Sequence, residues 1–212
     1  MTGAPGEEIT AVLWYTAAKN QERVCAVKKE LIHTRTITVN CYETDGERLV
    51  VEGSLTDERH CPYVLHALNQ RRDPGLMHQM MLTMELTIPQ LQILDLSAEM
   101  PVIPDMGCSD VKRAVQKLVG CRIQPGFTTQ VRAVLGKASG CIHLTNLILT
   151  MGSAAVQGLW SYFSRSREGG AALSQFVEDG SILLDSCYMW RKDGPFVRNI
   201  LQRAAGEQKK GR

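Results

Sequence analysis

Cys141 and His143 are the two residues whose types and spacing point most directly to chemistry. They lie two positions apart, directly after Gly140, at the start of an apolar pattern with helical spacing. The N-terminus of a helix carries partial positive charge and free N–H groups, which favour a thiolate over a thiol. A thiolate beside an imidazole can bind zinc or iron, and it can also act as a nucleophile with its base. The pair therefore indicates a metal site or a site of sulfur chemistry.

Two further cysteines and one histidine extend this hypothesis. Cys108 follows a glycine and precedes a predicted helix with capping residues, so it is a second thiol at a helix start. His78 has the same parity as the alternating apolar residues from Met80 to Ile88, which places it on the buried side of a strand. Cys187 follows an apolar run and is either part of the core or a further ligand.

These residues together predict one mixed metal site. We expect Cys108 and Cys141 to be thiolate ligands, with His78 and either His143 or Cys187 completing four-coordination. Such a ligand set suits Zn²⁺ or an Fe–S cluster.

A predicted β-hairpin places a polar pair on the apolar side of the sheet. Residues 31–42 and 49–57 alternate around a turn at Thr44–Gly46. His33 and Arg35 share the apolar parity of the first strand, and Asp57 shares that of the second. With this turn His33 is expected directly opposite Asp57, and we predict a hydrogen bond between them that orients the imidazole.

The remaining elements predict an α+β fold. Residues 59–75 read as a long loop, and strands follow before and after Pro89, with a bulge expected near Ile93. Helical spacing then appears in three segments, which begin near Val111, near Phe127 and at Cys141. Strands in the first half and helices in the second indicate an antiparallel sheet covered by helices on one face.

Composition limits the function classes. The chain has 212 residues, 24 Lys+Arg and 22 Asp+Glu, a balance that argues against nucleic acid or a membrane surface as partner. No apolar run is long enough to span a bilayer, and the first residues lack a signal-peptide pattern, so we expect a cytoplasmic protein with reduced thiols. We expect an extension at 1–30, a single domain at 31–202 and a disordered basic tail at 203–212.

The motifs resemble an uncharacterised bacterial family, domain of unknown function 2889. The resemblance covers about residues 31–198 and rests on a series of short motifs in sequence order: His33-Thr34-Arg35, Asp57 with Gly53 and Leu55, His78-x-Met80, Cys108, Gly140-Cys141-x-His143-Leu144 and Asp185-Ser186-Cys187. This chain has Gln79 where the family usually has aspartate, so any role of that carboxylate is lost here.

A weaker similarity concerns layout. The order of a strand pair, a cysteine, helices and a Cys/His pair is similar to the iron–sulfur scaffold proteins of the IscU and NifU N-terminal type. Cys108 and Cys141 correspond to scaffold cysteines, whereas His78 stands near the place of the first one and the Cys-x-His order is reversed. The similarity implies an IscU-like arrangement of sheet and helices.

The favoured hypothesis is therefore a metal-binding accessory or scaffold-like protein, acting with a possible protein partner. The first alternative is a small enzyme or ligand-binding protein, in which Cys141 or Cys187 is a nucleophile, His143 or His33 its base and Asp57 the orienting carboxylate. The second alternative is a structural subunit of a larger complex whose thiols are merely buried.

Overall fold

The computed structural model describes residues 29–44, 48–165 and 183–210. The chain divides into two compact units, Met1–Ile32 and His33–Arg212. The sequence placed the first boundary two residues earlier. The described strands and helices all lie in the second unit.

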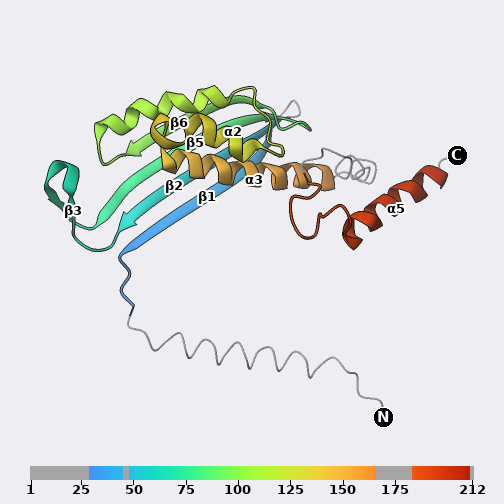
Figure 1. The fold of residues 1–212 in the computed structure, drawn as a ribbon, viewed down its shortest axis with the longest axis horizontal. Coiled ribbons are helices and arrows are strands. Elements are labelled where there is room, and N and C mark those ends of the chain that lie inside the picture. Colours follow the sequence, from blue (N-terminus) through green and yellow to red (C-terminus); the bar gives the residue numbers. More distant parts are fainter. Residues whose placement is uncertain (1–28, 45–47, 166–182, 211–212) are drawn as a thin grey trace, which may run out of the picture. The chain divides into compact units, whose positions relative to one another are not determined.

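A four-stranded antiparallel sheet is the centre of this unit, with the strand order β1-β2-β5-β6 (Figure 1). The strands are β1 (His33–Thr44), β2 (Arg48–Arg59), β5 (Gly75–Thr87) and β6 (Ile93–Val102). Side chains alternate between the two faces of a strand. Odd-numbered residues of β2 from Leu49 to Asp57 and even-numbered residues of β5 from Met80 to Leu86 are buried on the same face. The alternation read from the sequence is thus confirmed.

The pairing of β1 with β2 differs from the predicted register. Three residues, 45–47, separate the strands, so Thr44 pairs with Arg48 and Arg35, rather than His33, lies directly opposite Asp57. The prediction began the turn too early, which moved every pair by two positions. A shift of two keeps the face of each side chain, whereas a shift of one would have exchanged the faces.

The predicted bulge near Ile93 is confirmed. The register of β5 with β6 shifts between Glu85 and Leu86, where the partners change from Asp95 to Ile93. This extra residue lets both Ile93 and Leu96 be buried although their numbers differ in parity.

Residues 59–75 contain more regular structure than the long loop that the sequence predicted. They contain a small two-stranded sheet, β3 (Tyr63–Leu65) and β4 (Gln70–Arg72), joined by the short 3₁₀ helix η1 (His66–Leu68). Asn69 ends η1 in a left-handed conformation, which asparagine tolerates better than most residues.

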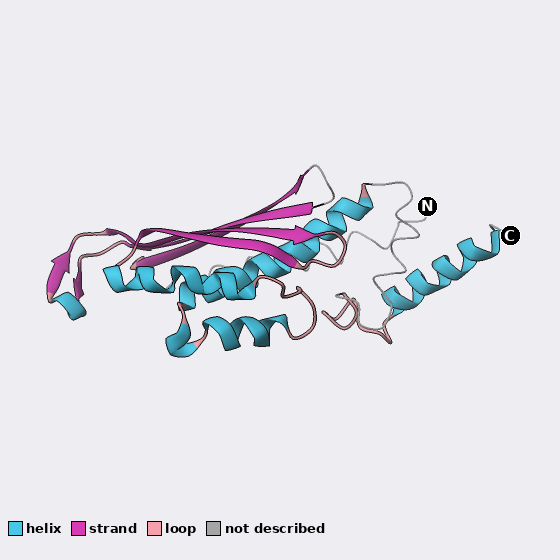
Figure 2. Cartoon of the chain, turned by 90° about the horizontal axis from the view of Figure 1, so that it is seen from above, coloured by secondary structure: helices cyan, strands magenta, loops and turns pink. Residues whose placement is uncertain are grey.

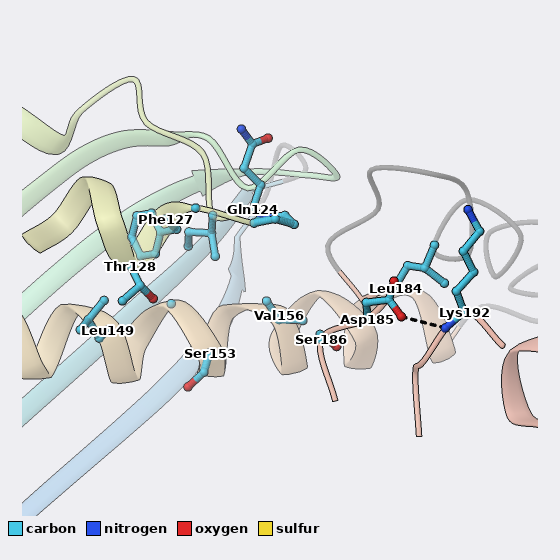
Figure 3. A pocket seen from close by; sticks show the side chains of 14 residues that line it. Gln124, Phe127, Thr128, Leu149, Ser153, Val156, Leu184, Asp185, Ser186 and Lys192 are labelled. Atoms are coloured by element: carbon cyan, nitrogen blue, oxygen red, sulfur yellow. Dashed lines mark hydrogen bonds between the residues drawn. The ribbon is translucent and has the colours of Figure 1, made fainter. Parts of the chain in front are cut away.

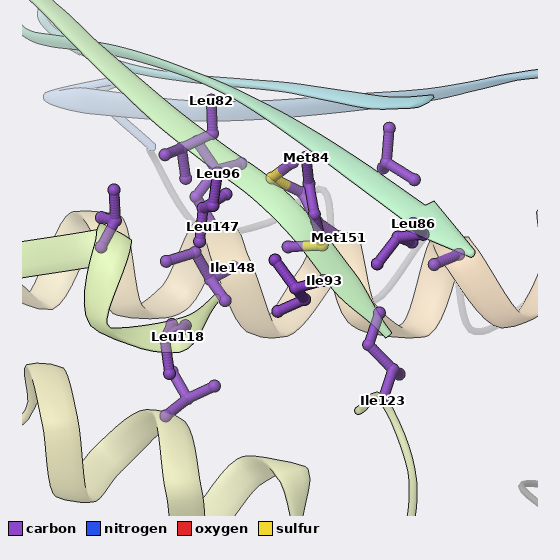
Figure 4. Close-up of a cluster of buried hydrophobic side chains, with 14 of the residues drawn as sticks. Leu82, Met84, Leu86, Ile93, Leu96, Leu118, Ile123, Leu147, Ile148 and Met151 are labelled. Carbon is purple, nitrogen blue, oxygen red and sulfur yellow. The ribbon is translucent and has the colours of Figure 1, made fainter. Parts of the chain in front are cut away.

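The helices cover one face of the sheet (Figure 2). They are η2 (Met106–Leu118), α2 (Phe127–Leu135), η3 (Lys137–Ser139) and α3 (Ile142–Ser164). Buried residues from the sheet, η2, α2 and α3 form one apolar cluster, part of which is shown in Figure 4. The predicted α+β class, with an antiparallel sheet first and helices second, is confirmed.

Two helix predictions need correction. The first helix is a 3₁₀ helix that begins at Met106, with Asp105 as its cap, so Cys108 lies inside its first turn and not before it. At the C-terminal end, α5 (Pro195–Lys210) is helical through most of the stretch expected to be a disordered tail. The sequence also predicts a polar linker at residues 164–170, and from residue 166 onwards this stretch lies outside the described residues. Within the described ranges, no helix has both the length and the apolar character that a membrane crossing requires.

Candidate metal centre

Asp57 is the centre of a polar cluster on the helix-covered face of the sheet. It lies near the end of β2 and is only 3% exposed. Its cross-strand partner Arg35 donates two hydrogen bonds to the carboxylate, from Nε to Oδ1 at 2.7 Å and from Nη2 to Oδ2 at 2.8 Å. This paired donation holds the pKa of Asp57 well below its usual range, although burial acts in the opposite direction. The carboxylate is therefore ionised at neutral pH.

Three histidines surround the same carboxylate. His33 Nε2 lies 3.1 Å from Oδ1, which confirms the predicted hydrogen bond between His33 and Asp57. His78 Nδ1 and His143 Nε2 lie 3.1 Å and 3.2 Å from Oδ2. His33 reaches Asp57 diagonally from the edge strand, His78 from its direct cross-strand position on β5, and His143 from the first turn of α3.

His78 and His143 form an imidazole pair within this cluster. Their ring centroids are 4.0 Å apart at an interplanar angle of 33°. The two side chains are 16% and 17% exposed. Burial, together with the positive charges of Arg35 and Arg59, lowers the pKa of His78 although the Asp57 carboxylate acts to raise it. A neutral imidazole, the form that binds metal ions, is thereby favoured at neutral pH.

Cys141 contacts the opposite side of the His143 ring. Its Sγ lies 3.6 Å from His143 Nδ1, and the residue is the N-cap of α3, as predicted. Burial raises the pKa of the Cys141 thiol. The hydrogen bond to His143 and the backbone N–H groups of His143 and Leu144 outweigh burial, so the pKa is lowered overall.

The start of α3 is held against the backbone at the end of α2 by Thr145 and Gly140. Thr145 is buried and donates a hydrogen bond from Oγ1 to the carbonyl oxygen of Leu135, at the end of α2, at 3.2 Å. It also contacts the Cys141 carbonyl, through Oγ1 and through its own N–H, both at 2.9 Å. Gly140 makes the tight approach possible, because a Cβ there would overlap the Leu135 backbone. These contacts set the position from which His143 reaches the sheet.

Asp57, His78 and His143 form a group that could hold a metal ion. One ligand atom from each of the three lies within 4.8 Å of the other two. Among the described residues this is the one group of three or more histidine, cysteine or carboxylate side chains with that property. It contains two of the five predicted ligands, and Asp57, which the sequence placed only in a supporting role.

The predicted cysteine ligands are not part of this group. Cys108 is half-buried in η2, Cys141 is half-buried and contacts His143, and Cys187 is exposed. None of the cysteines in the described ranges forms a disulfide. The signal for Asp57 was present in the sequence, since it is a charged residue at a buried position of an alternating strand.

A separate pocket of about 590 Å³ lies between the start of α2, the middle of α3 and residues 184–192 (Figure 3). Phe127 and Val156 contribute apolar walls, and Asp185 Oδ1 accepts a hydrogen bond from the backbone N–H of Lys192 at 2.8 Å. None of the predicted site residues lines this pocket.

Comparison with known proteins gives one match. Neither the curated proteins nor the solved structures include a significant match to this chain, so the layout similarity to iron–sulfur scaffold proteins is not confirmed. One family model matches residues 33–157, a range that contains His33, Asp57, His78, Cys108 and the Cys141/His143 pair but ends before Cys187. The chain therefore belongs to the family described as "Protein of unknown function (DUF2889)".

Proposed function

We propose that this protein binds a divalent transition-metal ion through Asp57 Oδ2, His78 Nδ1 and His143 Nε2, and acts as a metal-binding accessory protein. The observation that supports the proposal is the convergence of these three atoms at the buried end of β2. They come from β2, β5 and α3. The fold thus brings together residues that lie up to 86 positions apart in the sequence, from Asp57 to His143.

The distances fit coordination to a common ion. Two ligand atoms that are each about 2.1 Å from one ion lie roughly 3.0–3.4 Å apart for angles between 90° and 109°. Asp57 Oδ2 is 3.1 Å from His78 Nδ1 and 3.2 Å from His143 Nε2. When no ion is bound, His78 Nδ1 is hydrogen-bonded to Asp57 Oδ2 and His143 Nε2 lies at contact distance from it, so binding requires these nitrogens to be unprotonated but little movement of the side chains.

Arg35 leaves a coordination site on the carboxylate. An ionised carboxylate offers about four lone-pair positions, two on each oxygen. Arg35 occupies one on each oxygen, and His33 occupies the second on Oδ1. The second position on Oδ2, which faces His78 and His143, is the one available to an ion.

The donor atoms favour Zn²⁺ or Fe²⁺. Two imidazoles and one carboxylate are typical of catalytic zinc sites and of non-haem iron(II) sites. Iron–sulfur clusters are held mainly by thiolates, and this group contains none. Three protein ligands also leave at least one position open, so the ion would be accessible to a substrate or a partner, unlike a closed structural zinc.

A second function is favoured by a different observation. Cys141 Sγ, His143 and Asp57 form a continuous chain of contacts, at 3.6 Å and 3.2 Å, in the order of nucleophile, base and orienting carboxylate. In this enzyme His143 Nε2 donates to Asp57 and Nδ1 receives the thiol proton, so His143 cannot bind an ion through Nε2 at the same time. The two functions therefore predict different results when the reactivity of Cys141 and the metal content of the protein are measured.

Metal analysis of anaerobically purified protein tests the proposal. Wild-type protein loaded with Zn²⁺ or Fe²⁺ is expected to hold one ion per chain after desalting. His78→Gln and His143→Gln remove a ligand each and should weaken the affinity at least about 100-fold. His66→Gln is the matched control, because His66 is an exposed histidine on η1.

Cysteine exchanges distinguish the alternatives. Cys108→Ser and Cys187→Ser should retain the ion, and their loss of metal would instead support the predicted thiolate ligands. If Cys141 is a nucleophile, iodoacetamide should alkylate it rapidly in metal-free protein, and His143→Gln should slow that reaction. Wild-type protein that binds neither metal would contradict the proposal and leave the enzyme or the structural-subunit alternative.

A further inference from the structure

Strand β1 is an edge of the four-stranded sheet, because it pairs with β2 on one side only (Figure 1). Its other side carries backbone N–H and C=O groups, which form no backbone hydrogen bond with any residue that the structure describes. The opposite edge, on β6, is partly covered. Gly120 N–H donates to the Ile93 carbonyl at 2.8 Å, and Gln116 Nε2 donates to the Leu96 carbonyl at 2.7 Å. Within the described ranges, the sheet therefore has one protected edge and one open edge.

The open edge lacks the features that usually prevent strands from pairing with one another. Such features include proline, lysine, bulges and very short strands. Strand β1 has 12 residues, contains neither proline nor lysine, and pairs with β2 without a shift in register. It therefore presents a long, regular template on which another strand can pair.

The inward-facing residues in the middle of β1 are apolar but not buried. Ile37 is 36% exposed, and Val39 and Cys41 are half-buried, whereas inward positions in the middle of β2 and β5 are fully buried. A groove of about 460 Å³ lies between this part of β1 and α3, where the Cys41 thiol donates to the Ala154 carbonyl at 3.4 Å. The described helices thus leave an apolar strip incompletely covered at the open edge, a feature typical of an interaction surface.

The sequence of β1 is complementary to itself in one antiparallel register. In this register Val39 of one copy lies opposite Val39 of a second copy, and Ile37 lies opposite Cys41. Arg35 then lies opposite Glu43, so apolar residues meet apolar residues and opposite charges meet. Moving the centre by one residue in either direction would place Arg35 opposite Cys41 or Ile37 opposite Glu43.

The two charged residues are accessible for this contact. The side chains of Arg35 and Glu43 are 35% and 41% exposed. Glu43 forms an ion pair with Arg165 at the end of α3, so in the paired strands it would lie between two arginines, one from each copy. On the outer face the same register places Thr38 opposite Asn40, which are both polar. The register therefore suits both faces of the strand.

We propose that a second copy of this chain binds to β1 edge to edge, with a twofold axis at Val39, so that the two sheets join into one continuous antiparallel sheet. Backbone hydrogen bonds between the two β1 strands supply affinity, and the apolar strip supplies specificity. Residues of the same parity lie opposite one another, so the helices of both copies cover the same face of the joined sheet. This dimer does not depend on the proposed metal site.

Sedimentation velocity of the full chain at increasing protein concentration tests the proposal. Wild type is expected to sediment as a dimer at micromolar concentrations. Ile37→Lys places a charge in the apolar strip, and Glu43→Lys places a like charge opposite Arg35, so each should weaken dimerisation at least about tenfold. Glu52→Lys is the matched control, because Glu52 is exposed on the outer face of β2, and it should dimerise as wild type. Circular dichroism verifies that each variant is folded.

Disulfide formation tests the register. Val39→Cys places two thiols opposite each other at the twofold axis, where the Cα atoms of an antiparallel pair are about 4.5–5.5 Å apart, within the range that a disulfide spans. Mild oxidation of Val39→Cys should therefore give linked dimers well above the wild-type level. Thr38→Cys, whose partner in this register is Asn40, should remain at the wild-type level.

Several results would overturn the proposal. A wild-type chain that remains monomeric across the micromolar range would leave the β1 edge to a different partner. A dimer that persists in both Ile37→Lys and Glu43→Lys, or that is lost equally in Glu52→Lys, would place the interface elsewhere. Stronger cross-linking of Thr38→Cys than of Val39→Cys would contradict the register.

Discussion

Asp57 explains why so many polar residues gather at one end of this sheet. A buried carboxylate without partners is strongly unfavourable, so its presence requires compensating donors. Arg35 supplies two hydrogen bonds and a balancing charge, and His33, His78 and His143 supply further contacts. Because Arg35 is a positive partner, the carboxylate remains ionised and available to an ion or an imidazole. Asp57 therefore contributes both to the folded structure and to the proposed site.

The ionised state of Asp57 leads to a prediction about acid stability. Its pKa is lowered in the folded state, so the folded protein binds fewer protons than the unfolded chain at acidic pH. The stabilisation is fully present above the unfolded carboxyl pKa of about 3.9 and decreases as the pH falls below it. Asp57→Asn should lower the free energy of unfolding by about 3 kcal/mol at pH 7, because Arg35 loses its ionic partner.

Urea unfolding at pH 7, 5 and 3 measures this effect. The difference between wild type and Asp57→Asn is expected to be similar at pH 7 and pH 5 and smaller at pH 3. Asp73→Asn, at an exposed aspartate, is the control. A difference that grows towards pH 3 would have the wrong sign and would contradict the role of the ionised carboxylate.

The sequence predicted the strands better than the connections between them. Alternation identified the buried faces of β2 and β5, because one side of the sheet is covered and selects apolar residues at every second position. The β1–β2 turn and the β3–β4 hairpin were wrong, because short turns are set by local backbone geometry that leaves a weak composition signal. The 3₁₀ character of η2 was missed for the same reason, since its apolar spacing also fits an α-helix.

Gly140 offers a test of how the elements position His143. Its backbone is extended at φ −164°, so conformational freedom is not the reason for glycine there. A Cβ would collide with the Leu135 backbone, which cannot move without displacing α2. Gly140→Ala should therefore shift the start of α3 and lower the free energy of unfolding by about 2 kcal/mol. Metal affinity should fall at least about tenfold because His143 moves away from Asp57.

Gly107→Ala is the matched control for Gly140→Ala. A Cβ at Gly107 would approach only the side chain of Asp105, at 3.1 Å, so a small adjustment accommodates it. Calorimetric Zn²⁺ titration and thermal unfolding of both variants compare the two positions. Wild-type affinity in a folded Gly140→Ala protein would show that the start of α3 does not set the site.

On the scale of the whole molecule, the candidate site depends on contacts that no local pattern encodes. His33 and Arg35 come from β1, Asp57 from β2, His78 from β5 and His143 from α3. The sequence predicted that His33 and Asp57 meet because a hairpin links them. The sequence contains no local signal that places α3 over β2. Cys141 and Cys108 were therefore predicted as ligands, whereas the structure groups Asp57 with His78 and His143. Tertiary packing decided which of several plausible ligands converge.

The fold also extends beyond the segment that defines the family. Leu159 and Leu183 belong to the buried core but lie after residue 157, and Trp160 packs edge-to-face on Trp190 at 5.5 Å. Each buried leucine contributes about 1.5–3 kcal/mol, a large share of a typical stability of about 5–15 kcal/mol.

Residues 33–157 alone should therefore lack a cooperative unfolding transition. Residues 33–212, which contain every core and site residue found in the described part of the chain, should unfold with the midpoint of the full chain and bind the same metal. Urea unfolding followed by tryptophan or tyrosine fluorescence compares the three chains, and a cooperative transition in residues 33–157 would show that the later residues are dispensable.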